Sequence, residues 1–390
     1  MAQSKKVLIT GGLGFIGMEV ARLLVDDGRQ VVLMDNLSAQ IHGALPDMSL
    51  QPLVRHSLVE IRRGDVREPG VWARTLKDVS SVVHLAAETG TGQSMYEISR
   101  YTETNVGGTA SLLDYLANNK HSVTKVILAS SRSVYGEGAY LCERCGIVYP
   151  PMRTESMLRM QQWEPKCPEC GETACAAATP ECAVTSPASI YAATKLAQEH
   201  LVRIASQSLG IPAVIFRFQN VYGEGQSLKN PYTGILSIFS NQLRQGRTIN
   251  LYEDSRESRD FVHVSDVARA VVLGLISDGG DGCTLNVGAG RATSVAAIAR
   301  LLQERLGGDS RMVVSGQFRS GDIRHGYADL SLIRAKLGFA PEVSLEEGLD
   351  RFVAWVRTQQ VEPDRLDTAT RELVARGLMD GHRESTTVAV

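Results

Sequence analysis

Long hydrophobic runs and an excess of one charge are both missing from this 390-residue sequence. The longest apolar stretches, such as VIFRF and AVVLGL, suit a strand or a helix and are far shorter than a membrane span. The N-terminal MAQSKKVLIT leads into a strand pattern without the apolar region of a signal peptide. The formal net charge of -2 provides no field for holding nucleic acid or an anionic membrane. We therefore expect a cytoplasmic protein without nucleic-acid or membrane partners.

Cysteine is almost absent outside one segment, because six of the seven cysteines lie between Cys142 and Cys182. In a reducing compartment such a cluster indicates metal or redox chemistry rather than structural disulfides. Internal repeats and low-complexity tracts are also absent, which excludes a solenoid or an array.

The first forty residues predict a dinucleotide-binding unit. KVLIT and QVVLMD have the composition of buried strands, and IGMEVARLLVDDG between them has helical spacing. The turn before the helix contains Gly11, Gly12, Gly14 and Gly17, which satisfy both GxGxxG and GxxGxxG. Glycine allows a tight turn whose backbone N–H groups approach a pyrophosphate at the helix N-terminus. Asp35 would bind the adenosine ribose, and Asn36 rather than an arginine follows it, so NAD is favoured over NADP.

Other residues around this turn complete the expected cofactor site. In GDVRE, Asp65 follows another strand and is placed to accept from the adenine amino group, although a helix N-cap explains it equally well. The remaining predicted cofactor contacts are Phe15, Ile16, Val66, Leu85, Ala86 and Ala87.

A group of hydroxyl and amino side chains is expected at the carboxyl end of the sheet. Strands and helices continue to alternate, which predicts a doubly wound parallel sheet with ligands beyond its carboxyl edge. Ser130, Ser131 and Ser133 lie at such a strand end, and Tyr191 and Lys195 lie one helical turn apart on one face. A nearby ammonium lowers the pKa of a tyrosine from its usual value of about 10. The tyrosine is then able to take the proton of an alcohol while hydride passes to a nicotinamide.

These motifs together resemble the extended short-chain dehydrogenases/reductases, in particular the NAD-dependent nucleotide-sugar epimerase/dehydratase family. The likeness rests on TGGLGFIG, HLAA, SxSVYG and YxxxK, continues through RFQNVYGEGQ, SRDFVHVSDVA and RSGDIRHGYAD, and covers residues 5–357 apart from the cysteine segment. It implies a Rossmann domain with a smaller substrate-binding lobe, and a homodimer. It also implies that Tyr191 is the acid/base, Lys195 its electrostatic partner and nicotinamide-ribose ligand, and Ser131 the hydroxyl that bonds the reacting sugar oxygen.

The resemblance further implies a nucleotide-sugar site. Its expected contacts are Asn220 at the phosphates, Arg259 and Arg319 at the diphosphate, and Asp322 at the sugar of the nucleotide. Arginine suits this role because its rigid donor fork matches phosphate oxygens. For Arg259 the alternative is a surface ion pair with Glu257 or Asp260.

Residues 132 and 133 bear on the reaction. The family's 4,6-dehydratases have an Asp-Glu pair directly before VYG, and its decarboxylating members have a glutamate at the second position; here Arg132 and Ser133 stand there. Without those carboxylates, elimination lacks its acid and base. We therefore expect a nucleotide-sugar 4-epimerase that acts through a transient 4-keto sugar. Simple oxidation or reduction of a nucleotide sugar is the nearest alternative, and a non-catalytic NAD-sensing protein is a remote one.

The substrate expectation rests on longer segments. HLAAETGTGQSMYEISRYTETNVGGT, the cysteine segment and QNVYGEGQSLKNPYTGILSIFS resemble the dTDP-L-rhamnose 4-epimerase subgroup. A dTDP-deoxysugar is therefore the expected substrate, with UDP-hexoses and UDP-hexuronates as alternatives.

The cysteine segment predicts a structural zinc site. Cys142, Cys145, Cys167 and Cys170 form CxxC-x21-CxxC, a four-thiolate pattern, with Cys175 and Cys182 as spare or alternative ligands. The glycine that follows each pair helps backbone N–H groups to point at the sulfurs. A redox pair and idle thiols are the alternatives. Because the segment lies between Ser131 and Tyr191, we expect it to shape or cover the sugar pocket, with a subunit contact as the alternative.

The expected organisation has four parts. They are a Rossmann domain over 1–222 completed by about 259–290, the cysteine insertion at 140–182 within it, the substrate lobe over 223–258 and 291–360, and a final helix and tail at 361–390.

Overall fold

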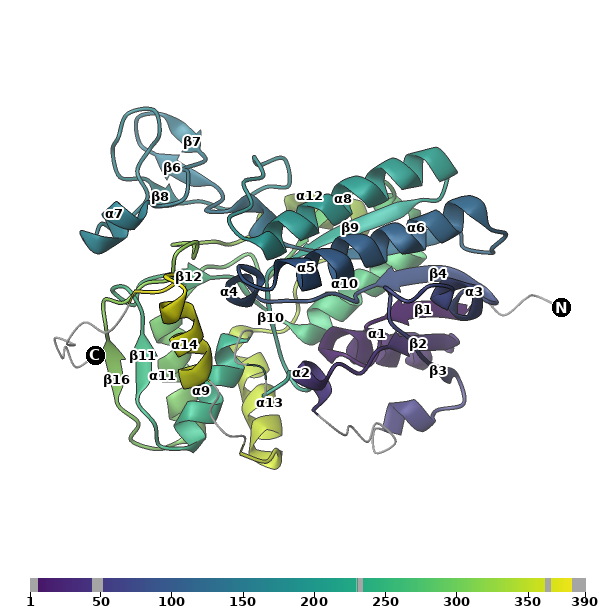
Figure 1. Cartoon of the computed structure of the whole chain (residues 1–390). Coiled ribbons are helices and arrows are strands. Elements are labelled where there is room, and N and C mark those ends of the chain that lie inside the picture. Colours follow the sequence, from purple (N-terminus) through teal and green to yellow (C-terminus); the bar gives the residue numbers. More distant parts are fainter. Residues whose placement is uncertain (1–5, 44–51, 229, 231–233, 362–365, 381–390) are drawn as a thin grey trace.

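Seven parallel strands form the central sheet (Figure 1). The computed structural model describes residues 6–43, 52–228, 230, 234–361 and 366–380. Across the sheet the order is β14-β9-β5-β4-β1-β2-β3. The strands are β1 (Lys6–Thr10), β2 (Val31–Asp35), β3 (Val59–Arg63), β4 (Val79–His84), β5 (Lys125–Ser131), β9 (Ala213–Phe218) and β14 (Thr284–Val287). Their Val- and Ile-rich sequences suit a sheet that is covered on both faces. The doubly wound sheet predicted from the sequence is therefore confirmed.

Helices pack on both faces of the sheet and divide its core into two clusters. On one face lie α1 (Phe15–Asp26), α10 (Val264–Ile276) and α12 (Ser331–Leu337). On the other lie α3 (Val71–Thr75), α6 (Gly108–Asn118) and α8 (Ile190–Leu209). We assign the residues of α12 to the smaller lobe by sequence, but Ile333 and Leu337 pack into the sheet core.

The smaller lobe has its own hydrophobic core. Its helices are α9 (Ile235–Arg244), α11 (Val295–Leu306) and α13 (Leu345–Thr358), and its strands β11 (Ile249–Leu251) and β16 (Met312–Val314) form a parallel pair. Two short pairs connect the lobe with the sheet: β10 (Asn220–Tyr222) with β13 (Phe261–His263), and β12 (Ser258–Arg259) with β15 (Thr293–Ser294). This connection places the carboxyl edge of the sheet against the lobe (Figure 1).

The cysteine insertion is a small separate layer beside the lobe (Figure 1). It contains the antiparallel strands β7 (Gly146–Val148), β6 (Tyr140–Cys142) and β8 (Cys175–Ala176) in that order, and α7 (Glu155–Arg159). Its own core cluster contains Tyr140, Cys142, Val148, Cys167 and Ala174. A core this small provides little hydrophobic stabilisation, so such modules commonly depend on metal or disulfide links.

Several short elements complete the described chain. They are α2 (Ala39–His42), α4 (Thr91–Ser94), α5 (Ile98–Tyr101), the π-helix η3 (Thr102–Gly107), the 3-10 helices η2 (Pro52–Arg55), η4 (Arg132–Tyr135) and η5 (Asp278–Gly280), and α14 (Leu366–Ala375). The predicted final helix corresponds to α14, whereas the predicted tail at 381–390 lies outside the described residues. Among the described helices, not one has the length and apolar character that crossing a membrane requires.

Candidate active site

The glycine turn between β1 and α1 leaves space for a ligand at a helix N-terminus. A Cβ at Gly17 would lie 2.5 Å from the Gly11 carbonyl oxygen, and one at Gly12 would lie 2.7 Å from that of Ile9. Side chains at these positions would therefore push the turn away from the helix. Gly14 is the N-cap of α1 and provides no capping side chain, so the first N–H groups of α1 have no side-chain cap. This is the cradle that a pyrophosphate fits.

The predicted adenosine contacts gather around the turn. Asp35 ends β2 and accepts from the backbone N–H groups of Leu13 at 3.2 Å and Leu37 at 2.9 Å. Asn36 donates to Asp65 at 2.9 Å. Asp65 also accepts from Arg67, whose side chain holds the pKa of Asp65 well below its usual range. The alternative N-cap role for Asp65 does not apply, because the N-cap of α3 is Gly70.

The other predicted cofactor residues also line this region. Leu85 follows β4 and donates its N–H to the Thr10 carbonyl, and Ala86 donates to the Thr10 hydroxyl. A Cβ at Gly11 would lie 3.0 Å from the Ala86 nitrogen, so this segment lies directly on the turn. Phe15 and Ile16 open α1, Val66 packs against Gly108, and Ala87 continues the segment after β4.

Polar side chains fix the first turn of α8, which carries Tyr191. Ser189 is the N-cap and accepts from the N–H of Ala192 at 3.1 Å. Ser94, at the end of α4, accepts from the N–H of Tyr191 at 3.0 Å. Both bonds satisfy amides that an isolated helix leaves unpaired. Tyr191 therefore lies in the first turn and Lys195 in the next one.

Ser131, Tyr191 and Lys195 come together at the carboxyl end of β5. Burial raises the pKa of Tyr191, while its hydrogen bond with Ser131 lowers it. The Lys195 ammonium lies 6.0 Å from the centroid of the Tyr191 ring and donates to the Ala129 carbonyl at 2.9 Å. Burial lowers the pKa of Lys195 to about 8, although the nearby Glu199 raises it. The pKa of Tyr191 is therefore raised overall, whereas the sequence predicts that the Lys195 ammonium lowers it, because burial of the ring outweighs the groups that favour the phenolate.

A buried carboxylate supports Lys195 from the next turn of α8. Glu199 is fully buried and accepts from Arg217 at 2.9 and 2.7 Å and from the Ser130 hydroxyl at 2.5 Å. Ser130 therefore faces the helix rather than the ligand. The i, i+4 spacing that aligns Tyr191 with Lys195 also aligns Lys195 with Glu199.

Asn105 and Ser133 also contribute to the site. Ser133 is predicted from the sequence to lie at this strand end but is not among the predicted catalytic residues, and Asn105 is not predicted at all. Asn105 is fully buried in η3; its amide nitrogen donates to Thr194 at 3.0 Å and its oxygen accepts from the N–H of Glu88 at 2.8 Å. It therefore ties the segment after β4 to α8, inside the kind of helix that often marks a functional position. Ser133 donates its hydroxyl to Ser131 at 3.0 Å. In the sequence, the asparagine within the segment TNVGGT is the signal that could have indicated Asn105.

Two predicted phosphate ligands meet at one carboxylate. Arg259 is 8% exposed and donates to Asp322 at 3.0 Å. The alternative considered for Arg259, an ion pair with Glu257 or Asp260, is wrong. The segment 319–325 lies beside β12, and Asp322 in this segment pairs with Arg259 instead. Arg319 stacks on Tyr252 with its guanidinium carbon 4.7 Å from the ring centroid, and its Nε is buried without a partner among the described residues.

Four arginines surround Asp322 in total. Burial raises the pKa of Asp322, but Arg259, Arg319, Arg153 and Arg132 together hold it below its usual value. Neither Arg132 nor Arg153 is in the predicted substrate set. Arg153 is already paired with Glu137 and Glu253, but the guanidinium groups of Arg259, Arg319 and Arg132 share the single carboxylate of Asp322. This part of the site is therefore suited to an anionic ligand.

A cleft lies beside this charged group. Arg319, Asp322 and Ser189 line it, and α14 covers it with side chains that include Ala369 and Leu373. Asn220, the fourth predicted substrate residue, opens β10 and donates its N–H to the Asp260 carbonyl at 2.9 Å. The C-terminal helix therefore forms part of the pocket wall, a position that no feature of its sequence predicts.

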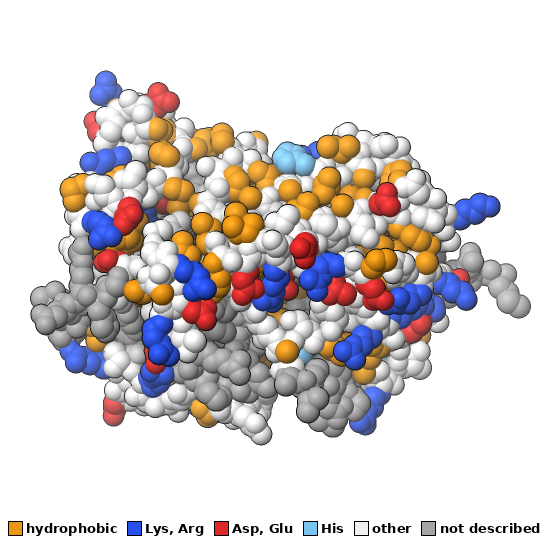
Figure 2. All heavy atoms as spheres, in the orientation of Figure 1, with side chains coloured by type: hydrophobic (Ala, Val, Ile, Leu, Met, Phe, Trp, Pro, Cys, Tyr) orange, Lys and Arg blue, Asp and Glu red, His pale blue; other side chains and the backbone are white. Residues whose placement is uncertain are grey.

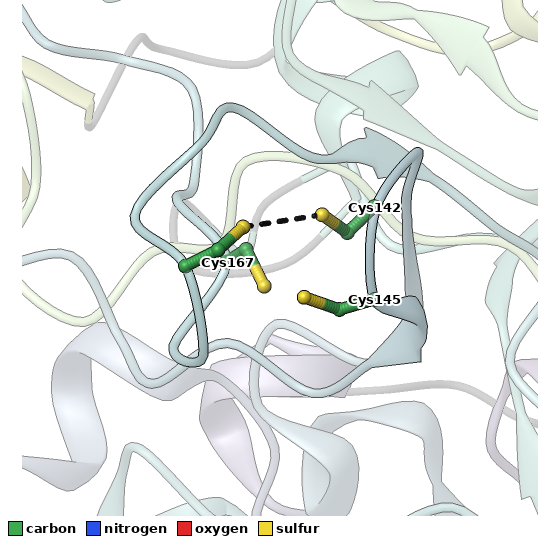
Figure 3. Close-up of side chains that lie close together, drawn as sticks. Cys142, Cys145 and Cys167 are labelled. Carbon is green, nitrogen blue, oxygen red and sulfur yellow. Dashed lines mark hydrogen bonds between the residues drawn. The ribbon is translucent and has the colours of Figure 1, made fainter.

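The four predicted metal ligands converge in the insertion (Figure 3). The sulfurs of Cys142, Cys145, Cys167 and Cys170 all lie within 4.8 Å of one another, and that of Cys142 is 3.5 Å from that of Cys170. Cys175 and Cys182 are exposed and lie outside this group. A tetrahedron with zinc–sulfur bonds of about 2.3 Å has edges of about 3.8 Å, so the donor set fits zinc.

Two glycines shape the backbone turns beside the four sulfurs. Gly146 and Gly171 have φ values of 78° each, a conformation that glycine adopts without strain. Burial raises the pKa of the Cys167 thiol, but N–H groups of Cys170 and Glu169 donate to its sulfur and hold the pKa below its usual value. The thiolate is the form that binds a metal.

Comparison with known proteins agrees with this geometry. The model of the NAD dependent epimerase/dehydratase family matches residues 7–156 and 168–288, and so passes over part of the insertion. A dTDP-L-rhamnose 4-epimerase of Burkholderia thailandensis is 41% identical, over 91% of this chain and 96% of its own length.

Solved structures give the same result. The UDP-N-acetylglucosamine 4-epimerase of Methanobrevibacter ruminantium M1, in complex with UDP-N-acetylmuramic acid, has a TM-score of 0.72 and 28% identity, over 92% of this chain and 99% of that one. The UDP-glucuronic acid 4-epimerase of Bacillus cereus, in complex with UDP-glucuronic acid and NAD, has a TM-score of 0.73 and 25% identity, over 90% and 99%. The chain, with its glycine turn, its Ser131–Tyr191–Lys195 group and its seven-stranded sheet, belongs to the NAD dependent epimerase/dehydratase family.

Proposed function

We propose that the protein is an NAD-dependent nucleotide-sugar 4-epimerase whose substrate is a dTDP-deoxysugar such as dTDP-L-rhamnose. The observation that supports the reaction type is the hydrogen bond between Ser131 and Tyr191. The two residues directly after Ser131 are an arginine and a serine, so neither is a carboxylate. A 4,6-dehydratase would need an acid and a base at those positions. The substrate class is supported by the 41% identical relative, which is a dTDP-L-rhamnose 4-epimerase.

Each residue of the site has a separate role in the proposed reaction. When bound, NAD supplies a group that accepts a hydride and returns it. Tyr191 takes the proton of the sugar hydroxyl and later gives it back, and Ser131 holds the reacting oxygen. Lys195 stabilises the charged form of Tyr191. The glycine turn, Asp35 and Asp65 would hold the cofactor, with Asp35 favouring NAD over NADP.

The arginine cluster would hold the diphosphate of the substrate. Arg259 and Arg319 both provide guanidinium groups near Asp322, and the buried Nε of Arg319 has no partner within the described part of the chain, so it would be able to donate to a phosphate oxygen. Asp322 is 46% exposed at its side chain and so remains accessible to a sugar hydroxyl of the nucleotide. Anchoring the substrate at a remote diphosphate leaves the sugar free to turn its other face to Tyr191.

The test is an incubation of purified protein and NAD with dTDP-L-rhamnose, then with UDP-hexoses and UDP-hexuronates. Sugar signals are followed by NMR and NADH by absorbance. A new 4-epimer without net NADH is the expected result. Net NADH with a keto product would indicate a dehydrogenase instead, and bound NAD without any sugar turnover would indicate an NAD-sensing protein.

We also propose that the four cysteines hold a structural zinc ion. Four thiolates close the coordination shell and leave no position for a substrate or water. The expected metal content is one zinc per chain by plasma mass spectrometry. Cys142→Ser should lose the metal and lower the melting temperature, whereas Cys175→Ser, an exposed cysteine outside the cluster, should change neither. Full metal content in the Cys142 variant would contradict the assignment.

A homodimer is proposed through α6 and α8. Hydrophobic side chains gather on the face where these helices lie (Figure 2). Leu113 and Leu209 line a groove between them, and Ile204 is 65% exposed. Light scattering should give twice the chain mass, and Ile204→Asp should shift it toward the monomer.

A further inference from the structure

We propose that Arg153 is a positioning residue through which the cysteine insertion holds the nucleotide-binding loop 319–322 in place. This inference rests on the proposed nucleotide-sugar site and adds a residue that lies between the two CxxC pairs. Binding of the nucleotide would then depend on the metal-held fold of the insertion.

The side chain of Arg153 donates hydrogen bonds to four residues from separate parts of the chain. Its Nη2 donates to the Asp322 carbonyl at 3.0 Å, and its Nη1 donates to the Glu253 carboxylate at 2.8 Å. Its Nε donates to Glu137 at 3.2 Å, and Nη1 also donates to the Trp163 carbonyl at 3.1 Å. The side chain is 1% exposed, so Arg153 acts on the loop rather than on a ligand.

Two routes lead from Arg153 to the arginines of the site. The first is direct, because the Asp322 carbonyl belongs to the residue whose carboxylate binds Arg259. The second passes through Glu253, whose neighbour Tyr252 accepts from Arg319 at 3.1 Å and stacks against it. Both predicted diphosphate ligands therefore depend on contacts of one insertion residue.

The segment 252–255, which Arg153 contacts through Glu253 and which contains the Arg319 partner Tyr252, is under backbone strain. Glu253 has a φ of 47°, and Ser255 has a φ of 69°, although neither is glycine. Such conformations are unfavourable for residues with a side chain and persist where surrounding contacts fix them. Here Arg153 and the fully buried Arg324 both bind Glu253. Removing one of these guanidinium groups would let the segment 252–255 relax and shift Tyr252, the partner of Arg319.

The cysteine cluster is connected to the same network. Tyr140, which packs with Cys142 and Cys167, donates its hydroxyl to Glu137 at 3.1 Å. Glu164, three residues before Cys167, accepts from Arg324 at 2.6 Å. Loss of the metal would loosen both anchors, because few apolar contacts hold the insertion together.

The test compares the zinc-loaded full-length protein with Arg153→Met. Calorimetry measures binding of dTDP and of UDP, and kinetics are measured with the active sugar. Arg153→Met should raise the Kd and KM about tenfold with kcat within about twofold, because displacing the loop weakens contacts to the diphosphate and leaves Tyr191 and Lys195 in place. NAD and zinc content should not change. Arg159→Met is the matched control, since Arg159 lies in the same insertion but is 55% exposed.

Metal removal completes a thermodynamic cycle. Chelation should weaken dTDP binding in the wild type. In Arg153→Met it should weaken dTDP binding little further, because the contact between the insertion and the loop 319–322 is already lost. Equal losses in both proteins would overturn the proposal, as would unchanged dTDP binding in Arg153→Met.

If Arg153→Met fails to fold, Arg153→Lys replaces it. Lysine keeps the charge but lacks the guanidinium fork that reaches four partners, so binding should still weaken, and unchanged binding would again overturn the proposal. If the wild type binds a nucleoside diphosphate but epimerises no sugar, the proposed function fails, while the binding comparison still decides the role of Arg153.

Discussion

Replacing Tyr191 with phenylalanine is expected to lower kcat by about 10²–10⁴-fold, because the hydroxyl is the proposed proton acceptor and donor. The ring remains, so packing in the first turn of α8 should be kept. Ser131 loses its hydrogen bond to the hydroxyl but still accepts from Ser133. NAD content and melting temperature should therefore stay close to those of the wild type.

The measurement is single-turnover epimerisation followed by NMR, with bound NAD quantified in the same sample. Tyr115→Phe, on the partly exposed surface of α6, serves as the control and should keep full activity. A Tyr191→Phe protein that retains more than a tenth of the wild-type kcat would show that another group moves the proton.

Replacing Arg217 with methionine is expected to destabilise the protein by about 3–5 kcal/mol, because it leaves the Glu199 carboxylate buried without its partner. Glu199 has no exposure to water and receives two bonds from Arg217. The Ser130 hydroxyl alone does not compensate a buried charge. Glu199 also lies one turn from Lys195, so a protonated Glu199 would stop raising the pKa of that lysine.

Denaturant unfolding at constant pH measures this effect. Arg203→Met is a matched control, since Arg203 reaches the same carboxylate at 3.8 Å but is 39% exposed at its side chain. That variant should change stability by less than about 1 kcal/mol. Arg217→Met combined with Glu199→Gln should recover part of the loss, and a loss as large as that of the single variant would show that packing rather than charge is responsible.

Local sequence determined the parts of this protein in which neighbouring residues decide the structure. The glycine spacing predicts the turn, since Gly12 and Gly17 have no room for a Cβ. The i, i+4 spacing places Tyr191 and Lys195 on one face, because one helical turn fixes it. Each CxxCG segment brings two sulfurs together through its own turn.

Only the tertiary structure decided which distant charges meet. Arg259 pairs with Asp322, 63 residues away, rather than with the acids beside it, and Arg153 reaches the same loop from the insertion. The sequence also does not predict that α14 covers the cleft or that Glu253 has a strained backbone. The physical reason is that periodicity and turn chemistry act over a few residues, whereas the pairing of buried polar groups depends on how separate layers dock. That docking brings four arginines to one carboxylate.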